Sequence, residues 1–183
     1  DSDVISSCRC WYTFRYFGHD SSLVSVLDGG LKKWRQEGKP IVNYETIISR
    51  SNYKALENKK MVKSKIEIDK NIKQKNFKVV DARSYERFKG IVPELRTNVK
   101  SGSIKGSYCL PFTKIINKNN NTFKNKDELN QVFKEVINTE DNNIVFSCGS
   151  GVTASVLALA YSLINNKYTP TIYDGSWSEY GLI

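Results

Sequence analysis

The sequence is short of the residues that build metal centres. It has one histidine and four cysteines among 183 residues, and no two cysteines stand in the x2 spacing typical of zinc sites. Cys8 and Cys10 are too close in sequence for an ordinary disulfide framework. We therefore expect no metal and no cofactor, and a reducing compartment, cytoplasmic or mitochondrial, rather than secretion.

Long hydrophobic runs are also missing. The longest apolar stretch, residues 152–164, is shorter than the ~20 residues that a bilayer requires, and it contains Thr153, Ser155 and Ser162. It is typical of a buried helix in a globular protein. We expect no association with a membrane.

Acidic residues are outnumbered by basic ones, and the formal net charge is +9. The lysines are scattered through asparagine-rich stretches such as residues 117–126, which we interpret as a solvated surface loop, and no nucleic-acid-binding motif accompanies them. We expect no nucleic-acid partner. The positive balance instead favours a small anionic substrate, whose local concentration it raises modestly.

Residues 144–154 carry the strongest chemical signal. They read Ile-Val-Phe-Ser-Cys-Gly-Ser-Gly-Val-Thr-Ala, which predicts a buried strand, a glycine-containing turn and the start of a small-residue helix. Backbone N–H groups of such a turn, followed by a helix N-terminus, form a cradle for negative charge. Cys148 lies at the break, where a thiol is expected to ionise easily and act as a nucleophile.

Two other classes of protein have loops of similar appearance. Gly149, Gly151 and Ala154 spell a G-x-G-x-x-A pattern, and Asp174 follows about 20 residues later, as in a dinucleotide-binding unit. Such a unit carries its fingerprint on the first strand of its sheet, whereas this loop lies late in the chain. A cysteine phosphatase resembles C-X5-R, but Ala154 takes the place of its arginine.

The loop is accompanied by further motifs that together resemble the catalytic half of a 3-mercaptopyruvate sulfurtransferase, a family of the rhodanese fold. In chain order the motifs are Val-Val-Asp-Ala-Arg-Ser-Tyr-Glu-Arg-Phe-Lys-Gly, Pro-Glu-Leu-Arg, Ser-Gly-Ser-Ile-Lys-Gly-Ser, Cys-Gly-Ser-Gly-Val-Thr, Ala-Ser-Val-Leu-Ala-Leu-Ala and Tyr-Asp-Gly-Ser-Trp-Ser-Glu-Tyr. The resemblance implies an α/β fold, a parallel sheet flanked by helices. Thiosulfate-preferring relatives carry basic residues after the cysteine, so Gly149 and Ser150 favour mercaptopyruvate over thiosulfate.

The resemblance also implies a set of site residues. Cys148 would take sulfur from a small anionic donor as a persulfide, and a small thiol, cyanide or a thioredoxin-like protein would accept it. Arg87 and Arg96 match the substrate-binding arginines, and a guanidinium holds a carboxylate in bidentate fashion. Ser150 either relays a proton or is a turn residue. The backbone cradle would comprise Gly149, Gly151, Val152 and Thr153.

Three other polar or reactive residues receive structural interpretations. Asp81 and Arg83, at the end of a strand, are expected to form an ion pair or hydrogen-bond network rather than contact substrate. Cys109 is expected to behave as a small hydrophobe. His19 follows a predicted helix and is interpreted as a C-terminal cap.

An internal repeat predicts the domain organisation. Residues 24–34 and 171–177 each read as a strand ending in Asp-Gly before a tryptophan-bearing helix, and helical patterns at residues 10–18 and 152–165 precede them. We expect residues 1–40 to be the remnant of an N-terminal rhodanese-like domain, 41–56 a linker and 57–183 the catalytic rhodanese-like domain.

The start of the chain bears on activity. It begins at Asp1 rather than a methionine, which favours a fragment of a tandem protein. Such a fragment would expose core surface and self-associate. The alternative to an enzyme is a catalytically weak rhodanese-like binding or regulatory module.

The predicted elements of the catalytic part alternate between strands and helices. Strands are expected at residues 61–64, 77–81, 107–110, 143–147 and 169–174, and helices at 67–75, 127–137 and 152–165. This alternation predicts a parallel sheet covered by helices, with the active site at the carboxyl ends of its strands.

Overall fold

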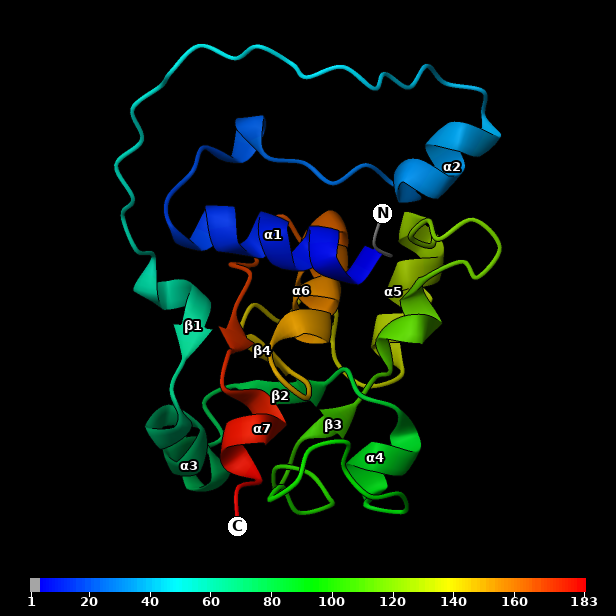
Figure 1. Ribbon diagram of the computed structural model, residues 1–183. Coiled ribbons are helices and arrows are strands. Elements are labelled where there is room, and N and C mark those ends of the chain that lie inside the picture. The colour runs from blue at the N-terminus through cyan, green and yellow to red at the C-terminus, as the bar shows by residue number, and fades with distance from the viewer. Residues whose placement is uncertain (1–3) are drawn as a thin grey trace.

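A computed structural model describes residues 4–183, and its centre is a five-stranded parallel sheet (Figure 1). The strand order is β1-β5-β4-β2-β3. The bounds are β1 Val62–Lys63, β2 Lys78–Asp81, β3 Tyr108–Cys109, β4 Ile144–Ser147 and β5 Ile172–Tyr173. The predicted α/β architecture is confirmed.

Helices cover both faces of this sheet (Figure 1). One face packs against α1, α5 and α6, and alternate strand residues such as Val80 and Phe146 point into that core. The other face packs against α3 and α7 through Val79, Val145 and Tyr173. Burial on both faces explains why β4 is buried at every position, as is usual for parallel sheets. The helix bounds are α1 Val4–Tyr16, α3 Lys65–Gln74, α4 Tyr85–Lys89, α5 Lys126–Lys134, α6 Val152–Ile164 and α7 Ser176–Tyr180.

Local sequence fixes several helix ends. A capping box formed by Ser64 and Glu67 starts α3, and another formed by Asn125 and Glu128 starts α5. Gly151, with φ of +78°, precedes α6. No helix among residues 4–183 combines the length and the apolar character needed to cross a bilayer.

The N-terminal part differs from its prediction at one element. Residues 24–28 form no strand, because no strand among the described residues pairs with them. Val24 is extended, but Leu23 and Leu27 are 72% and 55% exposed. The helices on either side are present, α1 before and α2 (Gly30–Gln36) after. His19 caps α1 as predicted, since its backbone N–H donates to the carbonyl oxygen of Phe14 at 2.9 Å.

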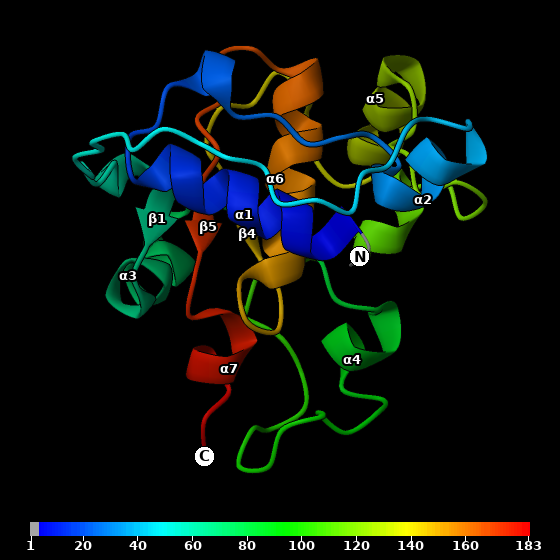
Figure 2. The same cartoon turned by 45° about the horizontal axis from the view of Figure 1, so that its top comes forward.

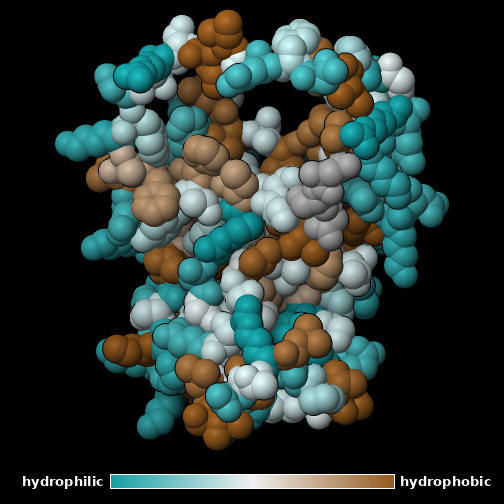
Figure 3. All heavy atoms as spheres, viewed as in Figure 1, coloured by the Kyte–Doolittle hydropathy of each residue, from teal (hydrophilic) through white to brown (hydrophobic). Residues whose placement is uncertain are grey.

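Residues 41–56 contain neither helix nor strand and are exposed throughout. Figures 1 and 2 show them as an extended trace that returns from α2 to β1. The trace is fixed at its end, where Leu56 N–H donates to the Phe17 carbonyl oxygen at 2.9 Å. Ile47 and Ile48 of this segment are 97% and 85% exposed. Figure 3 shows brown, hydrophobic spheres at the top of the molecule, the region where Figure 1 draws this trace.

Helix α1 packs against α6, the helix that follows Cys148. Cys8, Trp11 and Tyr12 of α1 belong to the same apolar core as Leu157 and Ala158 of α6. The N-terminal part is therefore joined to the sheet through the helix that leads away from the predicted nucleophile.

Candidate active site

Cys148 directly follows β4 and is buried. The register pairs Asp81 at the end of β2 with Ser147 at the end of β4, so the residues that follow both strands meet at one edge of the sheet. The Cys148 carbonyl oxygen accepts from the Trp177 N–H at 2.9 Å, and the Gly149 carbonyl oxygen accepts from the Ser178 N–H at 2.8 Å. The start of α7 thus fixes the backbone that carries the thiol.

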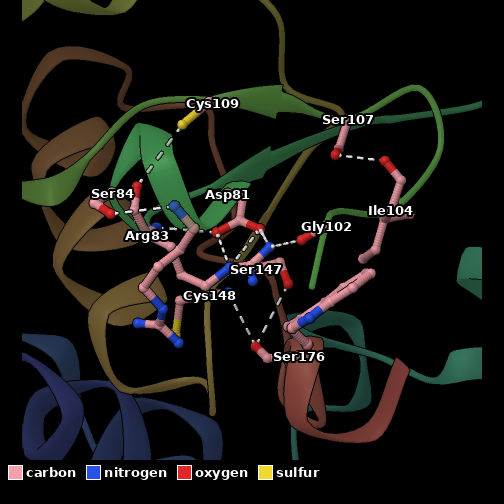
Figure 4. A network of polar contacts seen from close by, with 12 residues as sticks. Asp81, Arg83, Ser84, Gly102, Ile104, Ser107, Cys109, Ser147, Cys148 and Ser176 are labelled. Atoms are coloured by element: carbon pink, nitrogen blue, oxygen red, sulfur yellow. Dashed lines mark hydrogen bonds and ion pairs between the residues drawn. The ribbon is translucent and has the colours of Figure 1, made fainter. Parts of the chain in front are cut away.

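Ser176 is a functional residue that the sequence interpretation missed. It is fully buried, and its hydroxyl accepts from the Cys148 N–H at 3.1 Å (Figure 4). The same hydroxyl accepts from the Gly151 N–H at 3.0 Å and donates to the Tyr173 carbonyl oxygen at 2.7 Å. The serine has φ of +51°, which the sequence pattern does not reveal.

The bond to Ser176 corrects one expectation about the backbone cradle. The Gly151 N–H is already used by the Ser176 hydroxyl, so it is not available to an anion. A Cβ on Gly151 would lie 2.6 Å from Asp174 Oδ1, which together with its positive φ explains the glycine there. Asp174 itself forms an ion pair with Arg9 of α1, which lies beside the loop.

A cavity of about 190 Å³ brings the other predicted residues together. Seven of the eight predicted site residues line it, and Gly151 does not. The full lining is Arg87, Glu94, Leu95, Arg96, Val99, Cys148, Gly149, Ser150, Val152, Thr153 and Ser178.

The two predicted arginines flank the loop from different sides. Arg87 belongs to α4 and lies close to Gly149. A Cβ added to Gly149 would lie 3.3 Å from Arg87 Nη2. Its Nη2 is bonded to the Glu94 carboxylate, and its Nε is buried without a partner. Arg96 is exposed, and its Nη1 donates to the Gly149 carbonyl oxygen at 3.5 Å. Both guanidinium groups are therefore beside the thiol-bearing loop.

The expected Asp81–Arg83 ion pair is confirmed (Figure 4). Arg83 Nη2 donates to Asp81 Oδ2 at 2.7 Å and to the Gly102 carbonyl oxygen at 2.8 Å, and its Nη1 donates to Glu94 Oε1 at 2.6 Å. Burial alone lowers the pKa of the Arg83 guanidinium, but its bonds to Asp81 and the charges of both carboxylates more than offset this and raise it. Arg83 is a structural residue and does not line the cavity.

Glu94 is the second residue that the sequence interpretation missed. Its side chain is 4% exposed, bridges Arg83 and Arg87, and lines the cavity. The motif Pro-Glu-Leu-Arg contains it, and an acid following two arginines was the available signal.

Cys109 is unlike Cys148. It is only partly buried, and its Sγ lies 3.7 Å from the Arg83 carbonyl oxygen, so the residue expected to behave as a small hydrophobe also makes a weak polar contact. Burial, and then the nearby Asp81 charge, raise its thiol pKa to about 11. Cys10, Cys109 and Cys148 each carry a free thiol. Across residues 4–183 there is no group of three His, Cys, Asp or Glu side chains able to hold a metal ion.

Comparison with known proteins identifies the family. The model of the rhodanese-like domain matches residues 64–182, a range that includes strands β2 to β5, the Cys148 loop and both arginines. This chain belongs to the rhodanese-like family. Mouse 3-mercaptopyruvate sulfurtransferase is 36% identical over 98% of this rhodanese-like chain. The mitochondrial thiosulfate/3-mercaptopyruvate sulfurtransferase 1 of Arabidopsis thaliana is 33% identical over 97% of it.

A solved structure shows the same likeness. SseA from Escherichia coli, described as a 3-mercaptopyruvate sulfotransferase of rhodanese fold, superimposes with a TM-score of 0.77 at 30% identity. The match covers 96% of this rhodanese-like chain but 63% of SseA, and it covers 59% of the mouse relative and 51% of the plant relative. The chain therefore spans between half and two thirds of the length of these relatives.

Proposed function

We propose that this chain is the catalytic part of a sulfurtransferase that moves sulfane sulfur from 3-mercaptopyruvate, or from thiosulfate, to a thiol or cyanide acceptor. The observation that carries the proposal is the cavity in which Arg87 and Arg96 flank the Cys148 loop. A nucleophilic thiol reacts efficiently with a sulfur donor that is bound in a fixed orientation. Two guanidinium groups can bind the carboxylate of such a donor.

The reaction is a double displacement. The Cys148 thiolate attacks the sulfur of 3-mercaptopyruvate, an S–S bond forms and the C–S bond breaks with its electron pair on carbon. The resulting pyruvate enolate takes up a proton. An acceptor thiolate then attacks the outer sulfur of the persulfide, and the Cys148 thiolate leaves. Glutathione-sized thiols, cyanide and a thioredoxin-like protein are the acceptor classes that we propose.

The loop supplies stabilisation for the negative charge. Val152 and Thr153 are in the first turn of α6, where N–H groups have no partner within the helix. We assign these N–H groups and that of Gly149 to the thiolate and persulfide. Ser150 lines the cavity and is assigned the proton relay, and its alternative is a role in the turn only. Unchanged turnover in Ser150→Ala would remove the relay.

We also propose the domain organisation inferred from the repeat. Residues 1–40 are the end of an N-terminal rhodanese-like domain, 41–56 are a linker and 57–183 are the catalytic domain. The apolar side chains exposed around α1, Phe14, Phe17 and Leu23, support this division and self-association of the isolated chain. A monomeric elution profile at high concentration would contradict self-association. The free thiols favour a reducing compartment, cytoplasmic or mitochondrial.

The experiment is incubation of the protein with 3-mercaptopyruvate, and separately with thiosulfate, followed by intact and peptide mass spectrometry. The proposal expects one added sulfur on Cys148, formed faster from 3-mercaptopyruvate, and none in Cys148→Ser. The alternative that we retain is a catalytically weak rhodanese-like binding or regulatory module. No adduct from either donor would support the module.

A further inference from the structure

Four charged side chains form an alternating series that ends at the cavity. Asp81 pairs with Arg83, Arg83 with Glu94, and Glu94 with Arg87. Asp81, Arg83 and Glu94 are almost completely buried, with side-chain exposures of 2%, 1% and 4%. Charges that are buried this deeply are screened little by water, so their sum determines the potential in the adjoining cavity.

The sum of these four charges is zero, because two carboxylates face two guanidinium groups. The ionisable residues among those that line the cavity in the described part of the chain are Arg87, Glu94, Arg96 and Cys148. Arg96 donates to a backbone carbonyl oxygen, which does not cancel its charge. We assign the negative charge of the Cys148 thiolate to the backbone N–H groups of its loop. The charged side chains of the cavity walls, Arg87, Glu94 and Arg96, therefore offer one positive charge in excess to a bound donor.

We propose that Glu94 sets the charge of the sulfur donor, so that the cavity selects donors with a single negative charge. The inference rests on the proposed function, because it assigns donor binding to this cavity. A monoanionic 2-oxo acid with a thiol matches the excess charge of Arg96. A dianion such as thiosulfate leaves one charge uncompensated beside the Cys148 thiolate, which disfavours it in a partly desolvated site. Glu94 acts by cancelling the charge of Arg87 while Asp81 cancels that of Arg83.

The test measures binding of two unreactive anions and needs no turnover. Pyruvate is the singly charged probe and inorganic sulfate the doubly charged one. Each probe should protect Cys148 from alkylation by iodoacetamide, and the concentration dependence of protection gives its dissociation constant. The readout is the ratio of the two constants in the full chain. Wild type should bind pyruvate more tightly than sulfate.

Glu94→Gln is the decisive variant, with thermal unfolding as the check that it is folded. The amide keeps the volume and removes the charge, so the ratio should shift toward sulfate by about tenfold, which corresponds to ~1.4 kcal/mol. Glu94→Asp keeps the charge and should keep the preference for pyruvate. Glu86→Gln is the matched control, because Glu86 lies exposed on α4 and outside the cavity lining, and it should leave the ratio unchanged.

Equal weakening of both anions in Glu94→Gln would overturn the proposal, since it would show that Glu94 only positions Arg87. If Glu94→Gln does not fold, Leu95→Lys tests the same charge balance. Leu95 lines the cavity and is 87% exposed, so the lysine adds one positive charge without disturbing buried residues. That variant should also shift the ratio toward sulfate, and an unchanged ratio would contradict the proposal. Failure of persulfide formation would refute the proposed function without affecting this ratio.

Discussion

Residues 24–34 and 171–177 have related sequences and different structures. In the second segment Ile172 and Tyr173 form the buried strand β5, and Trp177 of α7 is 2% exposed. In the first segment the corresponding residues, Val26 and Leu27, form no strand, and Leu27 is exposed. The difference shows that an apolar run ending in Asp-Gly is compatible with a strand but is not sufficient to form one. A neighbouring strand supplies the hydrogen bonds and the buried face.

The two segments still agree in backbone conformation at one position of their turns. Gly30 and Ser176 occupy equivalent positions after Asp-Gly, and both have positive φ, +59° and +51°. Each segment also reaches across to the other part of the chain through its aspartate. Asp28 Oδ1 accepts from the Phe123 N–H at 2.8 Å, and Asp174 pairs with Arg9.

The largest predicted difference between the segments concerns their tryptophans. Trp177 stacks on Arg83, with 4.9 Å from the guanidinium carbon to the ring centroid, and its Nε1 donates to the Lys100 carbonyl oxygen at 2.7 Å. Trp177→Ala should lower the free energy of unfolding by about 3–5 kcal/mol. Trp34 is only partly buried, and its Nε1 donates to the Pro40 carbonyl oxygen at 2.9 Å, so Trp34→Ala should cost less, about 1 kcal/mol. Urea denaturation measures both, and equal costs would contradict the comparison.

A smaller effect is expected from the turn positions. Ser176→Ala removes the acceptor of the Cys148 and Gly151 N–H groups and should cost about 1–3 kcal/mol in the free energy of unfolding. It should also slow alkylation of Cys148. Ser176→Gly separates the two causes, because it relieves the positive φ but still lacks the hydroxyl. If the glycine variant matched wild type in both measurements, the hydrogen bonds would be irrelevant.

A Cβ on Gly30 meets nothing within 4 Å, so Gly30→Ala should cost only the strain of its φ, about 1 kcal/mol.

The two aspartates should contribute less. The Arg9–Asp174 pair is partly exposed, with side-chain exposures of 32% and 49%, so Asp174→Asn should lower stability by no more than about 1 kcal/mol. Asp28→Asn keeps an oxygen that accepts from Phe123 N–H and should have a similar or smaller effect. Added salt should reduce the first difference and leave the second unchanged. Urea denaturation at two salt concentrations measures both effects. An equal response of Asp174→Asn and Asp28→Asn to salt would contradict the interpretation of the first as an ion pair and the second as a hydrogen bond.

The smallest expected effect depends on pH. The pKa of Glu67 is lowered from 4.5 to about 2, first by its bond to Lys63 and then by the Ser64 backbone N–H of the α3 capping box. A carboxylate with a lowered folded pKa stabilises above its unfolded pKa, and this contribution is lost as the pH falls through the folded value. Glu67→Gln should therefore be less stable than wild type at pH 7, by under about 1 kcal/mol because the group is largely exposed. The stability difference between wild type and Glu67→Gln should shrink as the pH falls from 4.5 toward 2. Thermal unfolding of both proteins between pH 7 and 3.5 measures this difference, and a constant value over that range would contradict the prediction.

Much of this architecture follows from sequence pattern. Alternating apolar runs predicted the parallel sheet, and the strand-turn-helix signal around Cys148 located the loop at its carboxyl edge. The Asp81–Arg83 pair was predictable because the two residues lie two positions apart at a strand end. Local signals such as these lie within a few residues of one another.

The parts that could not be predicted depend on groups that meet only after folding. Ser176 follows Cys148 by 28 residues in the sequence. Its hydroxyl can accept from the Cys148 N–H because β5, which precedes Ser176, lies next to β4 in the sheet. Glu94 lies in a segment without helix or strand, so its position in the sequence motif does not show that it bridges Arg83 and Arg87. Residues 24–28 lack a strand for the same reason, since strand formation depends on a partner.

The attachment of the Cys148 loop to α7 has a practical consequence for engineering the protein. The N–H groups of Trp177 and Ser178 hold the carbonyl oxygens of Cys148 and Gly149. Deletions that remove the last helix would therefore take away the support of the nucleophile even though they stop many residues beyond it. The segment after α7 is held in turn, because the Ile183 N–H donates to the Asn98 carbonyl oxygen at 3.1 Å.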